Sequence, residues 1–282
     1  MTLLVTALSA FAQEENDTTS APVFEPQGAY EQLVEQAIRA VQADSLEWAE
    51  QLYKKALKLS PSDYRNTLIY ADLGRVCERR YWANPQNKRM ADQALDNYGM
   101  ALSRAPQAVP ILESRAQFYL KLGLYQKALS DFTTIVDVSP YNVTARNLRA
   151  YIYTQLRQTS DAKMEYERVL KIEPDNYTAQ LGLAILLQQT GKLQDAIARL
   201  SAMVEKEPDR AELLSVRAGM YAENGQLELA ILDLDRAIEL EPNNANFLVA
   251  RGYLHKQRGS DMLSKRDFER AIQLGVPRGS LE

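Results

Sequence analysis

The chain has 282 residues, of which 46% are hydrophobic and 25% are charged, and it carries a formal net charge of −4. This balance is typical of ordinary globular proteins, and without a basic excess we expect no nucleic-acid partner. Cys77 and His255 are the only cysteine and the only histidine, which excludes an intramolecular disulfide and a cysteine-and-histidine metal cluster.

The chain begins with a short apolar run, LLVTALSAFA at positions 3–12. The run is shorter than the roughly 20 residues that cross a bilayer as a helix, so we expect no integral membrane span. It ends in Ala10-Phe11-Ala12, the pattern of a signal-peptidase site, although no basic residues precede it. We interpret residues 1–12 as a truncated signal peptide, which predicts export to the periplasm or cell envelope; a cytoplasmic location is the alternative.

Residues 13–29 are polar and acidic, with Glu14, Glu15 and Asp17 followed by Pro22 and Pro26. Such a composition cannot bury enough apolar surface to offset the entropy lost when a chain becomes ordered. We predict a flexible leader over these residues.

From Tyr30 onward the sequence repeats itself. Pro140, Pro174, Pro208 and Pro242 each follow an apolar, helix-like stretch, and they are 34 residues apart. Self-similarity at this period indicates an array of repeats, each of which packs on its neighbours. Anchoring each repeat on its terminal proline gives seven repeats, followed by a tail at 279–282: 30–63, 64–108, 109–142, 143–176, 177–210, 211–244 and 245–278.

Each repeat contains two stretches with apolar side chains three and four positions apart, which predicts two amphipathic helices. Position 8 of the repeat is small, as Ala37, Ala71, Ala116, Ala150, Ala184, Ala218 and Gly252. Position 20 is also small, as Ala49, Ala94, Ala128, Ala162, Ala196, Ala230 and Ser264. Position 24 is large, as Tyr53, Tyr98, Phe132, Tyr166, Leu200, Leu234 and Phe268. Small residues on facing helices allow close packing, and the large residue fills the space beside them.

Glycine occupies position 15 in four repeats, as Gly123, Gly191, Gly225 and Gly259. This is where the chain leaves the first helix, and glycine readily adopts the positive φ that ends many helices. We therefore predict a left-handed residue at this turn.

These positions resemble those of the tetratricopeptide repeat family, a helix–turn–helix unit with small residues at 8 and 20, a large residue at 24 and proline at 32. The resemblance covers residues 30–278; in the last repeat position 32 is Val276, as expected of a capping repeat. It implies an all-α fold, a right-handed α-solenoid of antiparallel helix pairs. It also implies a protein–protein interaction scaffold rather than an enzyme.

The second repeat, 64–108, is 11 residues longer than the others. We predict that its first helix continues through Trp82 and breaks at 84–87 before the second helix begins. Insertions in one repeat often lie on a binding face; a tolerated elongation of both helices is the alternative.

The resemblance also implies that first-helix positions 2, 5, 9, 12 and 13 line a concave groove for an extended peptide or protein segment. Tyrosines among them provide a large contact area. The candidate groove residues are Gln117, Lys121, Asn147, Tyr151, Gln155, Leu181, Ile185, Gln188, Tyr253 and Lys256.

Position 7 carries arginine in four repeats, as Arg115, Arg149, Arg217 and Arg251. The favoured interpretation is that these arginines neutralise neighbouring carboxylates. The alternative is that they contact an acidic ligand.

Two other residues and two motifs have alternative interpretations. His255 is interpreted as a core residue rather than a metal ligand, because no second histidine is present. Cys77 is interpreted as a small apolar filler, although neighbouring arginines could lower its thiol pKa. The sequons at Asn142 and Asn176 are interpreted as helix N-caps, with glycosylation as the alternative.

The sequence contains no phosphate-binding loop, nucleophile elbow or kinase signature, so we expect no enzymatic activity and no cofactor. The predicted function is a non-enzymatic scaffold that binds an unidentified peptide or protein in the bacterial cell envelope. The alternative is a carbohydrate-binding or assembly subunit of an outer-membrane complex. The apolar edge of the last helix predicts either capping by the tail or self-association through the C-terminal repeat.

Overall fold

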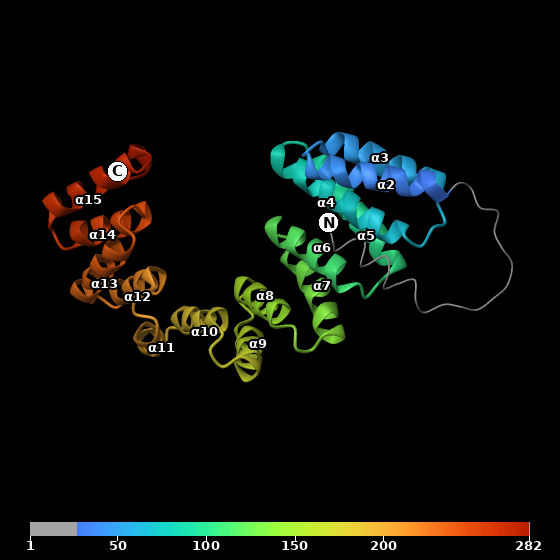
Figure 1. Ribbon diagram of the computed structural model, residues 1–282. Helices are drawn as coiled ribbons and strands as arrows, with labels where there is room; N and C mark the ends of the chain where they lie inside the picture. The colour runs from blue at the N-terminus through green and yellow to red at the C-terminus, as the bar shows by residue number, and fades with distance from the viewer. Residues whose placement is uncertain (1–26, 282) are drawn as a thin grey trace. The chain divides into compact units, whose positions relative to one another are not determined.

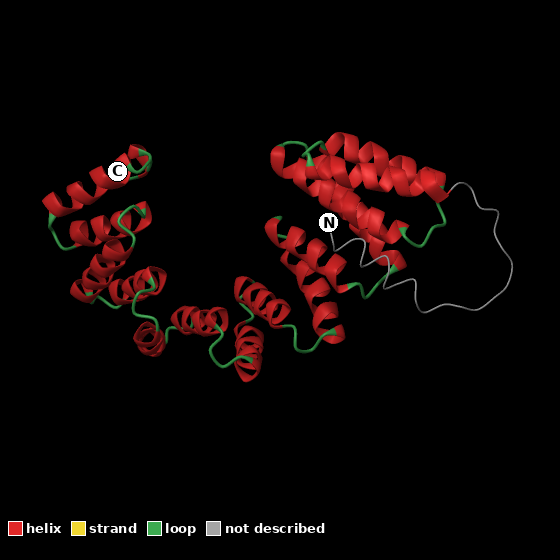
Figure 2. Ribbon diagram, in the orientation of Figure 1, coloured by secondary structure: helices red, strands yellow, loops and turns green. Residues whose placement is uncertain are grey.

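The computed structural model describes residues 27–281, so the predicted signal run and residues 13–26 of the predicted leader lie outside the described part. The described residues form fourteen α-helices and one short 3-10 helix, and none of them forms a β-strand (Figures 1 and 2). Helices that follow one another pack in pairs joined by short turns. The predicted all-α solenoid of helix pairs is therefore confirmed. None of the described helices combines the length and the apolar character needed to span a bilayer.

The first of the described helices, α2 (Gln27–Gln42), begins three residues before Tyr30, where the sequence predicts the start of the helical pattern. The prediction of a flexible leader is therefore wrong for residues 27–29. Pro26 precedes this helix in the sequence, and proline is compatible with a helix start because the first N–H groups of a helix have no partner within it.

The chain divides into two compact units, residues 1–106 and 107–282, which we describe separately. In the first unit α2 pairs with α3 (Leu46–Leu59), and α4 (Asn66–Ala83) pairs with α5 (Lys88–Arg104). α4 has 18 residues and α5 has 17, whereas helices of the second unit have 13 or 14. The extra residues of the second repeat therefore lengthen both helices on either side of the turn at 84–87, as predicted.

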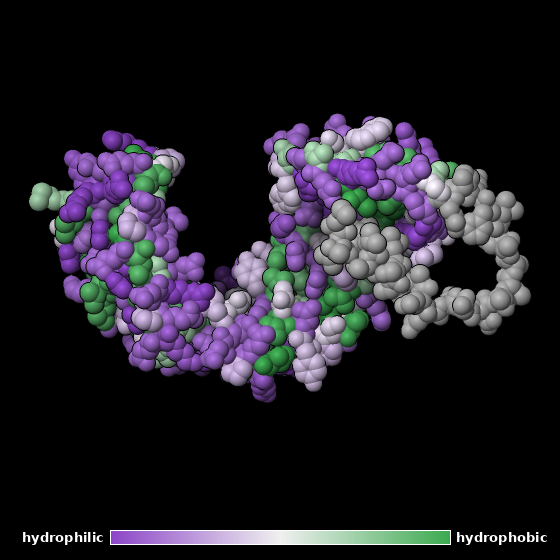
Figure 3. All heavy atoms as spheres, viewed as in Figure 1, coloured by the Kyte–Doolittle hydropathy of each residue, from purple (hydrophilic) through white to green (hydrophobic). Residues whose placement is uncertain are grey.

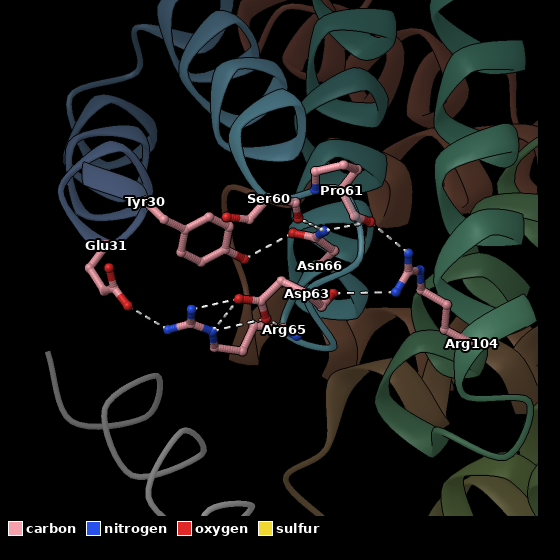
Figure 4. A network of polar contacts seen from close by, with 8 residues as sticks. All are labelled: Tyr30, Glu31, Ser60, Pro61, Asp63, Arg65, Asn66 and Arg104. Carbon is pink, nitrogen blue, oxygen red and sulfur yellow. Dashed lines mark hydrogen bonds and ion pairs between the residues drawn. The ribbon is translucent and has the colours of Figure 1, made fainter. Parts of the chain in front are cut away.

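Polar contacts fix the loop that joins α3 to α4 in the first unit (Figure 4). The hydroxyl of Tyr30 on α2 donates to Oδ1 of the fully buried Asn66 at 2.9 Å. The Nδ2 of Asn66 in turn donates to the carbonyl oxygens of Ser60 and Pro61. The network is completed by the side chains of Glu31, Asp63, Arg65 and Arg104. The two repeats of this unit are therefore joined by buried hydrogen bonds as well as by apolar packing.

In the second unit both helix series keep a step of 34 residues. The first helices of the repeats are α6 (Val109–Lys121), α8 (Val143–Gln155), α10 (Tyr177–Gln189), α12 (Ala211–Glu223) and α14 (Ala245–Gln257). The second helices are α7 (Tyr125–Val138), α9 (Thr159–Ile172), α11 (Leu193–Lys206), α13 (Leu227–Leu240) and α15 (Asp261–Gln273). Equivalent positions of different repeats therefore occupy equivalent places in the unit.

The core contains the residues that the repeat pattern predicted to pack between facing helices. The small side chains at positions 8 and 20 are buried in every repeat. The large residue at position 24 is buried in the first six repeats, and only Phe268, in the last repeat, is half-buried. Packing is close between repeats, because a Cβ added to Gly182 on α10 would overlap the ring of Tyr166 on α9.

The turn after each first helix contains a left-handed residue, as predicted. Gly123, Gly191, Gly225 and Gly259 have φ between 73° and 77°. The sequence pattern did not reveal that Asp44 and Arg157, at the same position of the first and fourth repeats, also have φ of 58°. A residue with a Cβ is strained in this region, so these two turns store backbone strain that glycine would relieve.

The end of the second unit is covered by its own tail. After α15 the chain forms the 3-10 helix η1 (Arg278–Ser280), and the following Leu281 is only 7% exposed. The hydroxyl of Tyr253 on α14 donates to the carbonyl oxygen of Ser280 at 3.3 Å. These contacts favour capping by the tail; self-association stays a prediction.

Candidate functional site

The candidate groove residues lie on four first helices of the second unit, and we call the exposed side of α6, α8, α10, α12 and α14 the first-helix surface. Gln117, Lys121, Tyr151, Gln155, Tyr253 and Lys256 are exposed, whereas Leu181, Ile185 and Gln188 are half-buried. Asn147 is buried, with 9% exposure. On the face drawn in Figure 3, hydrophilic side chains predominate and the apolar ones form separate patches. Most of the candidate residues are therefore accessible to a ligand.

Six of the candidates come together on two neighbouring helices. α8 and α10 lie against one another, and Asn147, Tyr151 and Gln155 on α8 follow one another at intervals of one helical turn. The other three, Leu181, Ile185 and Gln188, occupy the equivalent stretch of α10. Tyr253 and Lys256 lie two repeats further along, on α14, so they belong to a separate part of the surface.

Polar contacts between repeats already engage some of these side chains. The Nε2 of Gln188 donates to Oε2 of Glu223 at the end of α12. The Nδ2 of Asn147 donates to Oδ1 of Asn176 at 3.2 Å, and its own Oδ1 is buried without a hydrogen-bond partner among the described residues. Tyr253 packs edge-on against Phe268 with ring centroids 5.0 Å apart. Tyr151 and Gln155 are the candidates on α8 that make no such contacts within the described part of the chain.

The arginines at position 7 pair with acidic residues of their own repeats. Arg115, Arg217 and Arg251 each donate through Nε and Nη2 to both oxygens of an aspartate at position 23. These aspartates are Asp131, Asp233 and Asp267, whose side chains are at most 8% exposed. The favoured interpretation, neutralisation of neighbouring carboxylates, is confirmed. Arg251 also pairs with Asp235 of the preceding repeat at 2.6 Å. An acidic ligand is therefore not needed to balance the charges of these three arginines.

The fourth repeat contains a variant of this pair. Glu165 on α9 is 1% exposed and accepts hydrogen bonds from three arginines, Arg146, Arg149 and Arg168, at 2.7–2.9 Å. Burial alone would raise the pKa of this carboxyl, but the hydrogen bonds and charges of Arg149 and Arg146 outweigh it, so the pKa is lowered. Glu165 therefore stays ionised.

The fifth repeat lacks the pair. Leu183 stands at position 7, and Arg199 stands at position 23. Among the described residues no hydrogen bond or ion pair is formed by Arg199, which lines a hollow of about 600 Å³ between α10 and α11. Among the five repeats of the second unit, the fifth repeat of the chain is therefore the one in which positions 7 and 23 form no ion pair within the described residues.

Neither Cys77 nor His255 forms a reactive site. Cys77 is 1% exposed, and burial, together with the charge of Glu50, raises its thiol pKa to about 11. The arginines that follow Cys77 therefore do not activate it. His255 is 7% exposed, and its imidazole pKa is lowered mainly by burial. No group of three or more potential ligands for a metal ion occurs within residues 27–281.

The two sequon asparagines are helix N-caps, as predicted. The side chain of Asn142 accepts a hydrogen bond from the backbone N–H of Ala145 at 2.9 Å. The side chain of Asn176 accepts one from Ala179 at 3.0 Å. Satisfying a free N–H at a helix start stabilises the helix, so capping explains both motifs.

The lengthened repeat contributes to a second hollow, in the first unit. This hollow measures about 610 Å³ and lies between the α2–α3 turn and the α4–α5 turn. Its walls include Trp48, which is 49% exposed, and Met90, which is 9% exposed. The carboxylates at its rim are paired, Asp44 with Arg79 and Glu47 with Arg80. The insertion therefore adds a wall that other repeats lack.

Comparison with known proteins gives consistent matches. A family model described as tetratricopeptide repeat matches residues 153–219, and one described as TPR repeat matches residues 219–259. The crystal structure of a tetratricopeptide repeat protein from Parabacteroides merdae is 27% identical, with a TM-score of 0.73; the alignment covers 90% of this chain and 96% of that one. A structure of MamA from Desulfovibrio magneticus RS-1 is 18% identical with a TM-score of 0.50, covering 59% of this chain and 94% of that one. A search of curated proteins finds no match.

Proposed function

Since this chain is a tetratricopeptide repeat protein, we propose that it is a non-enzymatic scaffold that binds a peptide or protein segment along its first-helix surface. The fold itself supports a protein–protein interaction scaffold in general terms, because stacked repeats present extended surfaces for partners. The proposal adds the place of binding and a location in the bacterial cell envelope.

The observation that carries the proposal is the exposure of Tyr151. Tyrosines at core positions, such as Tyr98 and Tyr166, are at most 4% exposed, whereas Tyr151 is 42% exposed on α8. An exposed tyrosine provides a large, rigid contact area at low entropic cost, and tyrosine is enriched at interaction hot spots. It lies one helical turn before Gln155 on α8, and the neighbouring α10 carries the apolar Leu181 and Ile185. This combination suits a segment of mixed polarity.

A photo-crosslinking amino acid at position 151 of the full-length chain tests this surface in living cells. We expect a discrete crosslinked partner, identified by mass spectrometry, whose yield falls when Gln155 or Ile185 is replaced by alanine. The matched control is Tyr141, which is 81% exposed but lies in the loop before α8. Equal crosslinking from positions 141 and 151 would contradict the proposal. A glycan as the only captured species would favour the carbohydrate-binding alternative.

The proposed envelope location rests on the apolar run at 3–12 and the Ala10-Phe11-Ala12 motif. Cell fractionation of a C-terminally tagged chain tests it. We expect the tagged protein in the envelope fraction, with a mature N-terminus at Gln13 by mass spectrometry. Recovery of an uncleaved chain from the cytoplasm would contradict the envelope location. It would leave the scaffold proposal unaffected.

A further inference from the structure

A small polar pocket lies where the first helices of the fourth and fifth repeats end, beside the turn from α8 to α9. It has a volume of about 320 Å³, near the lower end for small-molecule sites. We call it the turn pocket, and it is lined by Thr154, Gln155, Arg157, Thr159, Leu186, Gln189 and Thr190. No acidic side chain lines it.

The polar side chains that line the turn pocket differ in whether they form hydrogen bonds within the described residues. The hydroxyls of Thr154, Thr159 and Thr190 each donate to a backbone carbonyl. In contrast, no hydrogen bond or ion pair within the described residues involves the guanidinium of Arg157 or the side-chain amides of Gln155 and Gln189. The turn pocket therefore offers one positive charge and two amides to a ligand.

Arg157 occupies a place where the fold favours glycine. The third, fifth, sixth and seventh repeats have glycine at this position with positive φ, whereas Arg157 has φ of 58°. A side chain in this conformation is strained, and such strain tends to persist at functional sites. Because the guanidinium makes no hydrogen bond or ion pair within residues 27–281, polar stabilisation of the fold does not explain the arginine.

The ends of α8 and α10 would oppose a negative ligand if their carbonyls were free, because a helix carries partial negative charge at its C-terminus. In α8 the carbonyl oxygens of Ile152, Tyr153 and Thr154 all accept hydrogen bonds from the following turn. In α10 those of Leu186, Leu187 and Gln188 do the same. The full charge of Arg157 therefore dominates the pocket.

We propose that the turn pocket binds a carboxylate, through a bidentate contact with Arg157 and hydrogen bonds from Gln155 and Gln189. A planar guanidinium matches the two oxygens of a carboxylate. A volume of about 320 Å³ accommodates a carboxylate together with the residue that carries it. As far as the carboxylate belongs to the peptide of the proposed function, this inference rests on that function. The affinity of the turn pocket for a carboxylate is measurable without any partner.

The test uses isotope-labelled full-length protein, inorganic phosphate and three small organic probes. The organic probes are N-acetylglycine, which ends in a free carboxylate, N-acetylglutamate α-amide, which carries a side-chain carboxylate, and the neutral N-acetylglycinamide. We expect a carboxylate probe to shift the Arg157 Nε–Hε signal and the side-chain amide signals of Gln155 and Gln189 in a saturable manner. Stronger shifts from N-acetylglycine identify a peptide C-terminus as the ligand, and stronger shifts from the glutamate probe identify an acidic side chain. Equal shifts from the neutral probe or from inorganic phosphate overturn the proposal.

Variants separate binding from folding. Arg157→Gly should weaken carboxylate binding about tenfold or more, the effect of losing a charged hydrogen bond. The same variant should melt at a temperature about 2–4 °C higher, because glycine relieves the strain. Binding that survives in Arg157→Gly overturns the proposal. The matched control, Gly225→Arg, places a guanidinium at the same turn of the sixth repeat, where Glu223 replaces the glutamine of position 13; it should not create carboxylate binding.

The two proposals fail independently. If Tyr151 crosslinks no partner but the carboxylate probes bind, the turn pocket stands and the first-helix surface does not. If Tyr151 crosslinks a partner whose affinity is unchanged in Arg157→Gly, and no carboxylate probe binds, the scaffold proposal stands and the turn pocket is overturned.

Discussion

Arg217 and Asp233 form a bidentate ion pair between the two helices of one repeat. Nε of Arg217 donates to Oδ2 at 2.8 Å, and Nη2 donates to Oδ1 at 2.7 Å. The same pair, 16 residues apart, occurs in the third and seventh repeats. The carboxylate of Asp233 is 8% exposed, and a buried carboxylate is stable only while its partner remains.

Arg217→Leu should lower the free energy of unfolding by about 3 kcal/mol, because it leaves the Asp233 carboxylate buried without a counter-charge. Urea denaturation followed by circular dichroism measures the change. The double variant Arg217→Leu/Asp233→Arg reproduces the residues of the fifth repeat, Leu183 and Arg199. It should recover much of the loss, since no buried carboxylate remains. If the double variant had the same free energy of unfolding as Arg217→Leu, the loss could not be attributed to the unpaired Asp233 carboxylate.

Gly182→Ala should lower the free energy of unfolding by about 1–3 kcal/mol, because the added methyl group overlaps the Tyr166 ring and forces the fourth and fifth repeats apart. In a Tyr166→Leu background the same change should cost little, because leucine fills position 24 in two other repeats. Gly219→Ala is the control, because a Cβ at Gly219 on α12 meets nothing within 4 Å. Alanine there should raise the free energy of unfolding by about 0.5–1 kcal/mol. Equal effects at the two glycines would contradict close packing at Tyr166.

Asp44→Gly should stabilise the first unit by about 1 kcal/mol, since Asp44 has φ of 58° and glycine adopts this conformation without strain. The variant loses an ion pair with Arg79, but the carboxylate is 78% exposed, and exposed pairs contribute little. Asp44→Ala, which loses the ion pair and keeps the strain, should not stabilise. The melting temperatures of wild type, Asp44→Gly and Asp44→Ala test this prediction. If alanine raised the melting temperature as much as glycine, backbone strain would be ruled out as the cause.

Glu165 should make stability depend on pH below its ordinary pKa of 4.5, because its pKa is lowered in the folded state. A lowered folded-state pKa stabilises the protein at pH values above the unfolded-state pKa, and this contribution is lost as the pH falls through the folded-state value. Glu165→Gln should cost about 3 kcal/mol at pH 7, because it leaves three arginines facing one neutral group.

The matching measurement is the difference in melting temperature between wild type and Glu165→Gln as the pH is lowered from 7 to 3. The difference should be constant above pH 4.5 and shrink below it. A difference that grows on acidification would contradict the assignment of the lowered pKa to Glu165.

Much of this protein was predictable from its sequence, because the repeat pattern records local requirements. The spacing of apolar residues determines the helices, small residues at positions 8 and 20 permit close packing, and glycine at position 15 permits the turn. For this reason the helix pairs, their buried alanines and the lengthened second repeat agree with the structure. Asn142 and Asn176 were recognisable as caps because a cap acts within one helical turn.

Tertiary structure alone decided what depends on contacts between helices. The arginines of position 7 were visible in the sequence, but their acidic partners lie 16 residues away on the facing helix, beyond the reach of any local pattern. Cys77 stands near arginines in the sequence, yet burial against the neighbouring helices raises its pKa. The surroundings of Arg157 come from two repeats, so its place in a pocket follows from packing. The sequence of this protein therefore determined its repeating architecture, while the folded chain decided which polar side chains are paired and which remain free to bind.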